Sequence, residues 1–222
     1  MKLIASDFDG TLFKGGVISD RDRAAIAAWR AAGNLFGIVT GRGGELPEHV
    51  TRELGLAIDF AVCGSGSMIF DGTPALVEFT VTPEEVAALL EDEARAHNAI
   101  SWGRAKCDKI TEGFCQFSTL MKDSDAARAY ADAVNEKYPQ VNAFQNGRCV
   151  DVVKKGISKA TGIARVAEMF DAASDAIYPV GDSYNDLPMI EVYGGFAIAG
   201  SAIADRAGKV CADIAALCES VS

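Results

Sequence analysis

Short apolar runs alternate with amphipathic, alanine-rich stretches through the first 62 residues of the chain. Each run is short and gives way to polar or glycine-containing sequence, as is typical of buried strands; the runs lie at residues 2–6, 35–39 and 60–62. Between them, helices are predicted over residues 20–32, with Ser19 as the N-cap, and over residues 47–54. Strands that alternate with helices in this way predict parallel βαβ units.

The pattern changes between residues 82 and 150. A helix is predicted to start at Thr82-Pro83, because two glutamates follow, and a second helix is predicted over residues 124–137. Asn146-Gly147 favours a two-residue hairpin turn. Two strands are predicted after each helix, at residues 100–104 and 114–120 and then at 141–145 and 148–153. The order α-β-β-α-β-β predicts an antiparallel sheet with helices.

The parallel pattern returns after residue 156. Helices and strands are predicted in turn at residues 158–170, 176–180, 186–192 and 196–199. The chain is therefore expected to form an α/β core with a parallel sheet, built from residues 1–81 and 152–222. An α+β insert over residues 82–151 interrupts this core.

Polar residues cluster where the predicted strands end or a helix begins. In open α/β sheets ligands bind beyond the carboxyl ends of the strands, so we expect these clusters to lie together. The four clusters are Asp7-Phe8-Asp9-Gly10-Thr11, Thr40-Gly41-Arg42, Lys159, and Gly181-Asp182-Ser183-Tyr184-Asn185-Asp186.

Each cluster has an ordinary structural explanation when it is taken alone, as a turn, a loop, an exposed helix residue or an N-cap. Their order along the chain points instead to phosphoryl transfer through an acyl phosphate. That reaction needs a nucleophilic carboxylate, together with hydrogen-bond donors and positive charge on the transferring oxygens. The two carboxylates of Asp7 and Asp9 also repel each other, which a divalent cation would relieve.

The composition of the chain disfavours several kinds of binding partner. The formal net charge of −10 disfavours binding to nucleic acid or to an anionic membrane. The first residues are too short an apolar run for a signal peptide, and no stretch is long enough to span a membrane, so a cytoplasmic protein is expected. Six cysteines without a C-x-x-C pair, and only two histidines, favour scattered thiols in a reducing compartment over a zinc site.

Taken together, the four clusters resemble the four motifs of haloacid dehalogenase (HAD) superfamily hydrolases, and specifically of the Cof-like type IIB subfamily. The resemblance covers essentially the whole chain. It implies a Rossmann-like three-layer core with a parallel sheet. It also implies that residues 82–151 form the αββαββ cap, type C2B, that determines substrate specificity. This chain departs from the family pattern at Ser65-Gly66 and at Gly200-Ser201-Ala202, where Asn-Gly and Gly-Asn-Ala are usual.

The resemblance also implies a role for each motif residue. Asp7 would be the nucleophile, Asp9 the general acid and base, and Lys159 the group that neutralises the nucleophile and the phosphate. Mg²⁺ would be held by Asp7, by the backbone carbonyl of Asp9 and by Asp182, with Asp186 as a further ligand or a supporting residue. The expected phosphate-binding residues are Gly10, Thr40, Gly41 and Asn185.

The function implied is a Mg²⁺-dependent phosphatase that hydrolyses a small phosphorylated metabolite, such as a sugar phosphate or phosphoglycolate, through an aspartyl phosphate. Two alternatives remain open at this point. One is a phosphotransferase or phosphomutase on the same scaffold, and the other is a phospho-accepting binding module without turnover. Monomer and dimer are both compatible with the sequence. Candidate specificity residues in the cap are Trp102, Arg104, Lys106 and Arg148.

Overall fold

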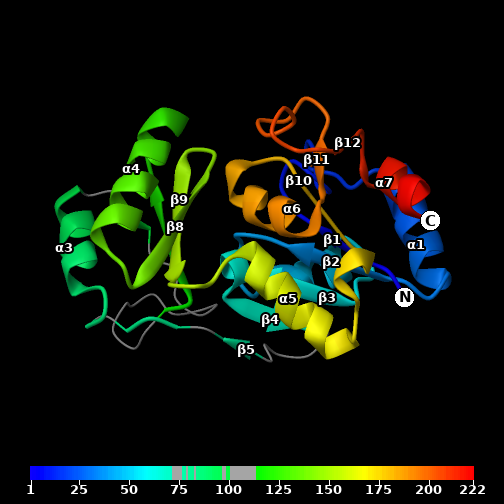
Figure 1. The fold of residues 1–222 in the computed structure, drawn as a ribbon, viewed down its shortest axis with the longest axis horizontal. Helices are drawn as coiled ribbons and strands as arrows, with labels where there is room; N and C mark the ends of the chain where they lie inside the picture. Colours follow the sequence, from blue (N-terminus) through cyan, green and yellow to red (C-terminus); the bar gives the residue numbers. More distant parts are fainter. Residues whose placement is uncertain (72–76, 79, 83, 97–98, 101–113) are drawn as a thin grey trace.

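The computed structural model describes residues 1–71, 77–78, 80–82, 84–96, 99–100 and 114–222. Figure 1 shows two parts, a larger one built on an eight-stranded sheet and a smaller one built on a four-stranded sheet. Both termini lie on the larger part, at the end remote from the smaller one (Figure 1). Three of the predicted specificity residues, Trp102, Arg104 and Lys106, lie outside the described residues.

The larger sheet is mostly parallel, as predicted. Its strand order is β12-β11-β10-β1-β2-β3-β4-β5. The parallel strands are β1 (Leu3–Ser6), β2 (Leu35–Val39), β3 (Phe60–Cys63), β10 (Ile177–Gly181), β11 (Phe196–Ile198) and β12 (Val210–Cys211). Beyond β3 the sheet continues through two antiparallel strands, β4 (Met68–Phe70) and β5 (Val77–Glu78). The sequence analysis did not predict the short strands β4, β5 and β12, whose conformation depends on pairing with neighbouring strands.

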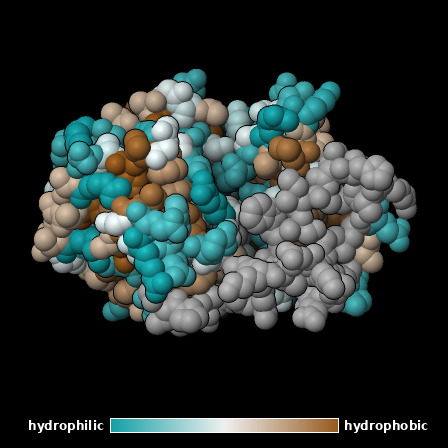
Figure 2. Space-filling model, turned by 180° about the vertical axis from the view of Figure 1, so that it is seen from behind, coloured by the Kyte–Doolittle hydropathy of each residue, from teal (hydrophilic) through white to brown (hydrophobic). Residues whose placement is uncertain are grey.

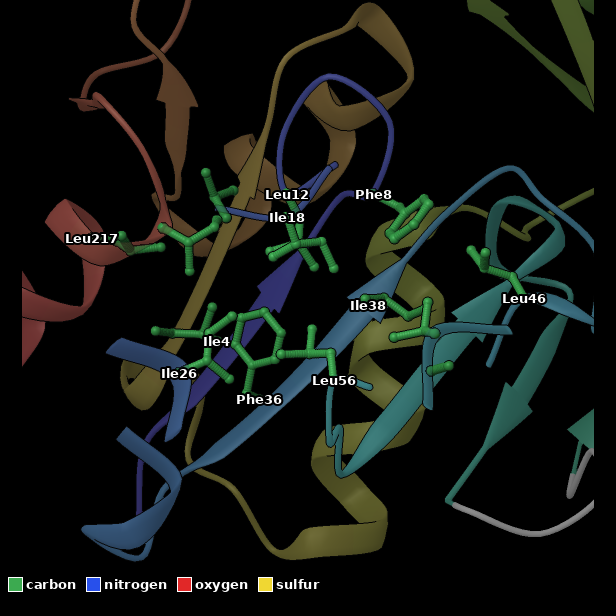
Figure 3. Packing of buried hydrophobic residues seen from close by; sticks show 14 of the residues in the cluster. Ile4, Phe8, Leu12, Ile18, Ile26, Phe36, Ile38, Leu46, Leu56 and Leu217 are labelled. Atoms are coloured by element: carbon green, nitrogen blue, oxygen red, sulfur yellow. The ribbon is translucent and has the colours of Figure 1, made fainter. Parts of the chain in front are cut away.

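Helices cover both faces of this sheet, which gives three layers. One face packs against α1 (Asp20–Ala31), α7 (Ile214–Val221) and α2 (Leu46–Glu48), which continues as a π-helical turn over His49–Glu53. Figure 3 shows the apolar cluster on this face, with Ile4 and Phe36 of the strands beside Ile26 of α1. The opposite face packs against α5 (Lys159–Phe170) and α6 (Leu187–Tyr193), which Figure 1 shows lying over the strands.

The start of α5 is defined by local hydrogen bonds. The backbone amide of Thr161 donates to Ser158 Oγ at 3.2 Å, and the amide of Ser158 donates to Thr161 Oγ1 at 2.9 Å. This reciprocal capping satisfies amides that have no partner within the helix. Lys159 is therefore the first helical residue, and its position relative to the sheet is set by the cap.

The smaller sheet is antiparallel, in the order β6-β7-β9-β8. Its strands are β6 (Ala99–Ile100), β7 (Gln116–Leu120), β8 (Val141–Asn146) and β9 (Cys149–Lys154). Two helices, α3 (Ala87–Ala96) and α4 (Ser124–Lys137), supply an apolar cluster with residues of one face of the sheet. Successive residues of a strand point to opposite faces of the sheet. Val150 and Val152 belong to the apolar cluster, so Asp151 between them lies on the opposite face, which carries polar side chains.

The hairpin between β8 and β9 differs from the prediction by one residue. Asn146 and Cys149 are paired across the strands, so Gly147 and Arg148 form the two-residue loop, rather than Asn146 and Gly147. Gly147 has a φ of 57°, which suits glycine at the first position of a type II′ turn. The shift leaves Asn146 on the strand, with its side chain near that of Asp151.

Seen from behind, the described surface forms two lobes with a notch between them (Figure 2). No helix in the described part of the chain combines the length and the apolar character that crossing a bilayer requires.

A substitution at Gly162 tests how closely α5 must pack on the sheet. A Cβ atom at this position would overlap Val62 of β3 and lie 3.2 Å from the Cα atom of Gly66. Helix propensity alone would favour alanine by about 1 kcal/mol. We expect Gly162→Ala to lower the free energy of unfolding instead, by about 1–3 kcal/mol, because α5 must move off the sheet.

Urea denaturation measures this change. Gly208→Ala is the control, since a Cβ atom at Gly208 meets nothing within 4 Å. Unfolding free energies that agree between the Gly162 variant and the unmodified protein would contradict the close packing of α5.

Candidate active site

The predicted polar clusters meet at one edge of the larger sheet. Asp7 follows β1, Thr40 follows β2 and Asp182 follows β10, and these three strands are neighbours in the sheet. A cleft of about 160 Å³ opens between this edge and the smaller sheet. It is lined by Asp7, Asp9, Thr40, Gly41, Arg42, Asp182, Ser183 and Asn185 of the larger part and by Ser118, Asn146, Cys149 and Asp151 of the smaller part.

Lys159 lies at the centre of the charged groups. Its ammonium group is 2.7 Å from Asp7 Oδ1 and 2.6 Å from Asp186 Oδ1, and it donates a hydrogen bond to each. All three side chains are buried, and that of Lys159 is 1% exposed. One buried cation is thus held between two buried carboxylates, which leaves this triad with one uncompensated negative charge.

Burial and charge act in opposite directions on these groups. Burial raises the pKa of Asp7 well above its usual value, Lys159 lowers it, and the neighbouring carboxylates of Asp186 and Asp182 raise it. For Lys159, burial alone would lower the pKa, but Asp186 and Asp7 outweigh that effect and raise it. Burial and then Asp186 raise the pKa of Asp182. The site has more carboxylate charge than its described cations neutralise.

Both oxygens of Asp186 are hydrogen-bonded within the protein. Its Oδ1 accepts from Lys159, and its Oδ2 accepts from the backbone amides of Asp182 at 2.9 Å and Ser183 at 3.0 Å. Asp186 therefore holds Lys159 and the loop that carries Asp182.

Asp7 and Asp182 present carboxylates suited to a hard cation. Ligand atoms of Asp7, Asp182 and Asp186 all lie within 4.8 Å of one another. Thr11 Oγ1 donates to Asp182 Oδ1 at 3.2 Å, which fixes that carboxylate. At Gly10, with φ of 85°, a Cβ atom would overlap the Asp182 side chain, so the backbone of the Asp9-Gly10 segment lies directly against it. Oxygen donors of this kind fit Mg²⁺.

Asp9 is held at the rim of the cleft by Arg42. The guanidinium group donates from Nε to Asp9 Oδ2 at 2.7 Å and from its terminal nitrogen to Oδ1 at 2.6 Å. Both side chains are about half exposed. Arg42 also lies over the ring of Phe8, 5.2 Å from its centroid. The sequence placed Arg42 in a motif but gave no sign of this bidentate pair, because its partner lies 33 positions away.

The loop after β2 is tied to the loop after β3. Thr40 donates its amide to Val62 O at 2.8 Å, and its carbonyl accepts from the amide of Ser65 at 2.9 Å. Ser65 has a φ of 53°, a left-handed conformation that asparagine or glycine adopts more readily. Ser65, one of the two departures from the family pattern, therefore lies at the Thr40-Gly41 loop and keeps the unusual backbone conformation.

Asn185 is 5% exposed and lines the cleft. Its Oδ1 atom accepts no hydrogen bond from the residues that the structure describes. A buried amide oxygen without a donor is costly, so a ligand in the cleft would satisfy it.

The smaller part contributes polar groups that were not predicted as site residues: Gln116, Ser118, Asn146 and Asp151. Gln116 Nε2 donates to Gly41 O at 2.8 Å, which links β7 to the phosphate-binding loop predicted after β2. Burial raises the pKa of Asp151, and hydrogen bonds from Ser118 and Asn146 lower it. Gln116 and Ser118 of β7 and Asp151 of β9 fall on one face of the sheet, so the alternation along these two strands is the signal that could have found them. Arg148, which was predicted, is exposed and donates to Met121 O at 3.2 Å, and it is absent from the lining of the cleft.

Comparison with known proteins shows the same architecture. A model of the haloacid dehalogenase-like hydrolase family matches residues 4–110 and 106–212. A haloacid dehalogenase-like hydrolase from B. subtilis superposes with a TM-score of 0.85 at 16% identity, covering 100% of this chain and 99% of that one. A HAD subclass IIB sugar phosphatase superposes with a TM-score of 0.81 at 20% identity, covering 99% and 97%.

Two curated proteins are similar over most of their length. A 5-amino-6-(5-phospho-D-ribitylamino)uracil phosphatase of Bacillus subtilis is 27% identical over 205 residues, which covers 87% of this chain and 82% of the relative. A phosphoglycolate phosphatase of Natronomonas pharaonis is 27% identical over 198 residues, which covers 88% and 84%.

Replacement of Lys159 tests the buried triad. Lys159→Met removes the cation and leaves Asp7 and Asp186 buried without an opposite charge. We expect the free energy of unfolding to fall by about 3–5 kcal/mol near neutral pH. Without Lys159 the folded-state pKa of Asp7 rises further above its unfolded value, so the loss grows as pH rises and shrinks as pH falls and the carboxylates take up protons.

Urea denaturation in the presence of a chelator, at pH 5 and pH 7.5, measures both effects. Lys155→Met is the control, since Lys155 is an exposed lysine four residues away. If Lys159→Met lowered the free energy of unfolding by the same amount at the two pH values, the electrostatic origin of the loss would be contradicted.

Proposed function

The chain belongs to the haloacid dehalogenase-like hydrolase family, and from that premise we propose that it is a Mg²⁺-dependent phosphatase that works through an aspartyl phosphate on Asp7. The observation that carries the proposal is the buried Lys159, which holds Asp7 at the floor of a cleft beside Asp182. The cleft of about 160 Å³ is small for a ligand site, which favours a small phosphorylated metabolite.

Asp7 is the proposed nucleophile. Its Oδ1 is hydrogen-bonded to Lys159, and its backbone amide donates to Val180 O at 2.9 Å. These contacts fix the carboxylate at the end of β1, so it needs no reorientation before attack. A carboxylate oxygen forms a bond to phosphorus while the bond from phosphorus to the leaving-group oxygen breaks. Water then attacks the aspartyl phosphate, which releases inorganic phosphate and restores the carboxylate.

Asp9 is the proposed general acid and base. It donates a proton to the leaving-group oxygen in the first step and takes a proton from the attacking water in the second. Both oxygens of Asp9 are bound by Arg42 in this structure. Proton transfer therefore requires Arg42 to release at least one oxygen. An anionic phosphoryl group in the cleft would draw the guanidinium toward itself and free Asp9 for that purpose.

The residues proposed to hold Mg²⁺ are Asp7 and Asp182 through their carboxylates and Asp9 through its carbonyl, with Asp186 in support. Bound there, the cation would supply positive charge that screens these carboxylates from the incoming phosphate and polarises its oxygens. Lys159 supplies a second positive charge from within the protein, next to Asp7.

The phosphoryl oxygens are proposed to bind at the loop after β2. Thr40 offers a hydroxyl, Gly41 a backbone amide, and Asn185, which lines the cleft, a side-chain Nδ2 group as hydrogen-bond donors. A Cβ atom at Gly41 would lie 2.7 Å from Asp151 Oδ2, so only glycine leaves room there beneath the smaller sheet. Gly10 is proposed to contribute through its backbone, since it lies against Asp182.

Residues 82–151 are proposed to act as a cap that covers the cleft, and residues 1–81 and 152–222 as the catalytic core. The cap strand β9 continues to Lys154, three residues beyond that boundary. Exclusion of water by a cap strengthens electrostatic interactions in the site and protects the reactive intermediate.

A phosphate-release assay tests the function. The purified protein is incubated with Mg²⁺ and a panel that includes p-nitrophenyl phosphate, D-ribitol 5-phosphate and 2-phosphoglycolate. We expect inorganic phosphate and the dephosphorylated product in equal amounts without an added acceptor. Phosphate that appears only on an added sugar would indicate a phosphotransferase or phosphomutase. Stable labelling of the protein without product release would indicate a phospho-accepting module.

Turnover should depend on a divalent cation. Treatment with excess chelator is expected to abolish phosphate release, because Asp7 and Asp182 would otherwise repel the phosphate dianion. Addition of Mg²⁺ beyond the chelator should restore the initial rate. Rates are measured with p-nitrophenyl phosphate, and circular dichroism shows that the chelator leaves the fold intact. Full activity in chelator would exclude the proposed role of the cation.

Asp7 and Asp9 should respond differently to the same substitution. Asp7→Asn is expected to leave at most trace turnover and no phosphoprotein after acid quenching, because no carboxylate can accept the phosphoryl group. Asp9→Asn should lower kcat about 10²–10⁴-fold while phosphoprotein still forms, because only proton transfer is lost.

Asp132→Asn is the matched control, since Asp132 is an exposed residue of α4 and undergoes the same loss of charge. Near-normal turnover in Asp7→Asn would refute its assignment as the nucleophile. Absence of phosphoprotein from Asp9→Asn would contradict the expectation that the first step survives the substitution.

A further inference from the structure

The proposed chemistry leaves one buried carboxylate in the cleft without a role. Asp151 of β9 is 3% exposed, yet it lines the cleft on the cap side. A carboxylate at such a position costs stability, because burial disfavours the charged form. Its neighbours Val150 and Val152 point into the apolar cluster of the cap, so Asp151 points out of that cluster, toward the core.

Protein groups satisfy only part of Asp151. Ser118 donates to Oδ1, in a short hydrogen bond between cross-strand partners. From the residues that the structure describes, Oδ2 receives two long hydrogen bonds, from Asn146 Nδ2 at 3.3 Å and from Ser65 Oγ at 3.4 Å. Hydrogen bonds to a carboxylate are usually about 2.5–2.9 Å long, so Oδ2 retains capacity for a closer donor.

Oδ2 also lies beside the loop proposed to bind the phosphoryl oxygens, and a leaving group attached to a phosphoryl group there would share the cleft with Asp151. A Cβ atom at Gly41 would approach it to 2.7 Å, so Oδ2 lies directly above the loop proposed to bind the phosphoryl oxygens. The cap groups around it are a hydroxyl, an amide and a thiol, from Ser118, Asn146 and Cys149. These polar groups are partners for hydroxyl groups rather than for an apolar chain.

The charges that line the cleft also disfavour an anionic leaving group. Arg42 is the one cationic side chain among the described residues that line the cleft, and both oxygens of Asp9 already occupy it. A carboxylate on the leaving group would therefore meet Asp151 without a cation from the described lining to offset the repulsion.

We propose that Asp151 is a specificity-determining residue that accepts a hydrogen bond from a hydroxyl of the leaving group. It thereby selects phosphate esters of neutral polyols over those whose leaving group carries a carboxylate. This inference rests on the proposed phosphatase function and narrows its substrate class. It separates the two kinds of substrate that the names of the relatives mention, a phosphoribityl compound and phosphoglycolate.

A structural role makes a different prediction. If Asp151 only ties the cap to the core through Ser65, its replacement should slow all substrates by a similar factor. If it binds a substrate hydroxyl, the loss should be confined to substrates that carry one. A comparison of substrates distinguishes the two roles.

The wild-type protein provides the first measurement. We expect kcat/KM for D-ribitol 5-phosphate to exceed that for 2-phosphoglycolate by at least about 10-fold, and also that for pentyl phosphate, which has the same number of carbons without hydroxyls. This comparison needs no variant, so it stands even if replacement of Asp151 impairs folding. A preference for 2-phosphoglycolate would overturn the proposal.

Asp151→Asn provides the second measurement. The variant should lower kcat/KM for D-ribitol 5-phosphate about 10- to 100-fold, mainly through KM, because a hydrogen bond to a charged acceptor is lost. Pentyl phosphate and p-nitrophenyl phosphate should change less than about 3-fold, and the discrimination against 2-phosphoglycolate should shrink. Asp132→Asn is the control for the same change of charge on the cap surface. An equal loss on all substrates would overturn the proposal in favour of a structural role.

The two levels of inference fail in different ways. Turnover of p-nitrophenyl phosphate without a preference for the polyol ester overturns the role of Asp151 and leaves the phosphatase function intact. If no substrate is hydrolysed, the phosphatase function fails, and calorimetric binding of D-ribitol 5-phosphate to the wild type and to Asp151→Asn decides the role of Asp151. Equal affinities would then overturn it.

Discussion

The buried ion triad of Lys159, Asp7 and Asp186 is the interaction on which the rest of the site depends. A lysine with a 1% exposed side chain is tolerated only because two carboxylates compensate its charge, at 2.6 and 2.7 Å. The triad joins the end of β1, the first turn of α5 and the loop after β10, and Asp186 passes the constraint on to Asp182 through two backbone amides. The capping of α5 by Ser158 and Thr161 is thus part of the site, because it determines where Lys159 lies.

Much of the core could be predicted because it follows from local pattern. Apolar runs identified β1, β2, β3, β10 and β11, and the rule that ligands bind at the carboxyl ends of parallel strands was enough to group Asp7, Thr40 and Asp182 from their positions in the sequence. The short strands β4, β5 and β12 escaped prediction because they owe their conformation to pairing with the sheet. The hairpin turn was displaced by one residue because both Asn146 and Gly147 suit a turn, and only cross-strand pairing selects between the two registers.

What local pattern could not supply is the pairing between distant residues. Lys159 contacts Asp7 across 152 positions, and Ser65 contacts Asp151 across 86. The cap illustrates the consequence. Basic and aromatic residues attract attention as substrate contacts in a sequence, but Arg148 bonds to Met121 O on the surface, whereas the cleft is lined by small polar groups. These groups are recognisable only when the alternation along β7 and β9 is combined with knowledge of which face packs on α3 and α4.

Charge balance explains why the proposed reaction needs more than the protein's own residues. The described groups in and beside the cleft include five carboxylates, from Asp7, Asp9, Asp151, Asp182 and Asp186, against two cations, Lys159 and Arg42. A phosphate ester brings further negative charge into a site where burial, and then the neighbouring carboxylates, already raise the pKa values of Asp7 and Asp182. On the proposed mechanism, a bound divalent cation must therefore raise the affinity for the phosphate ester. By linkage, each strengthens the affinity for the other by the same factor.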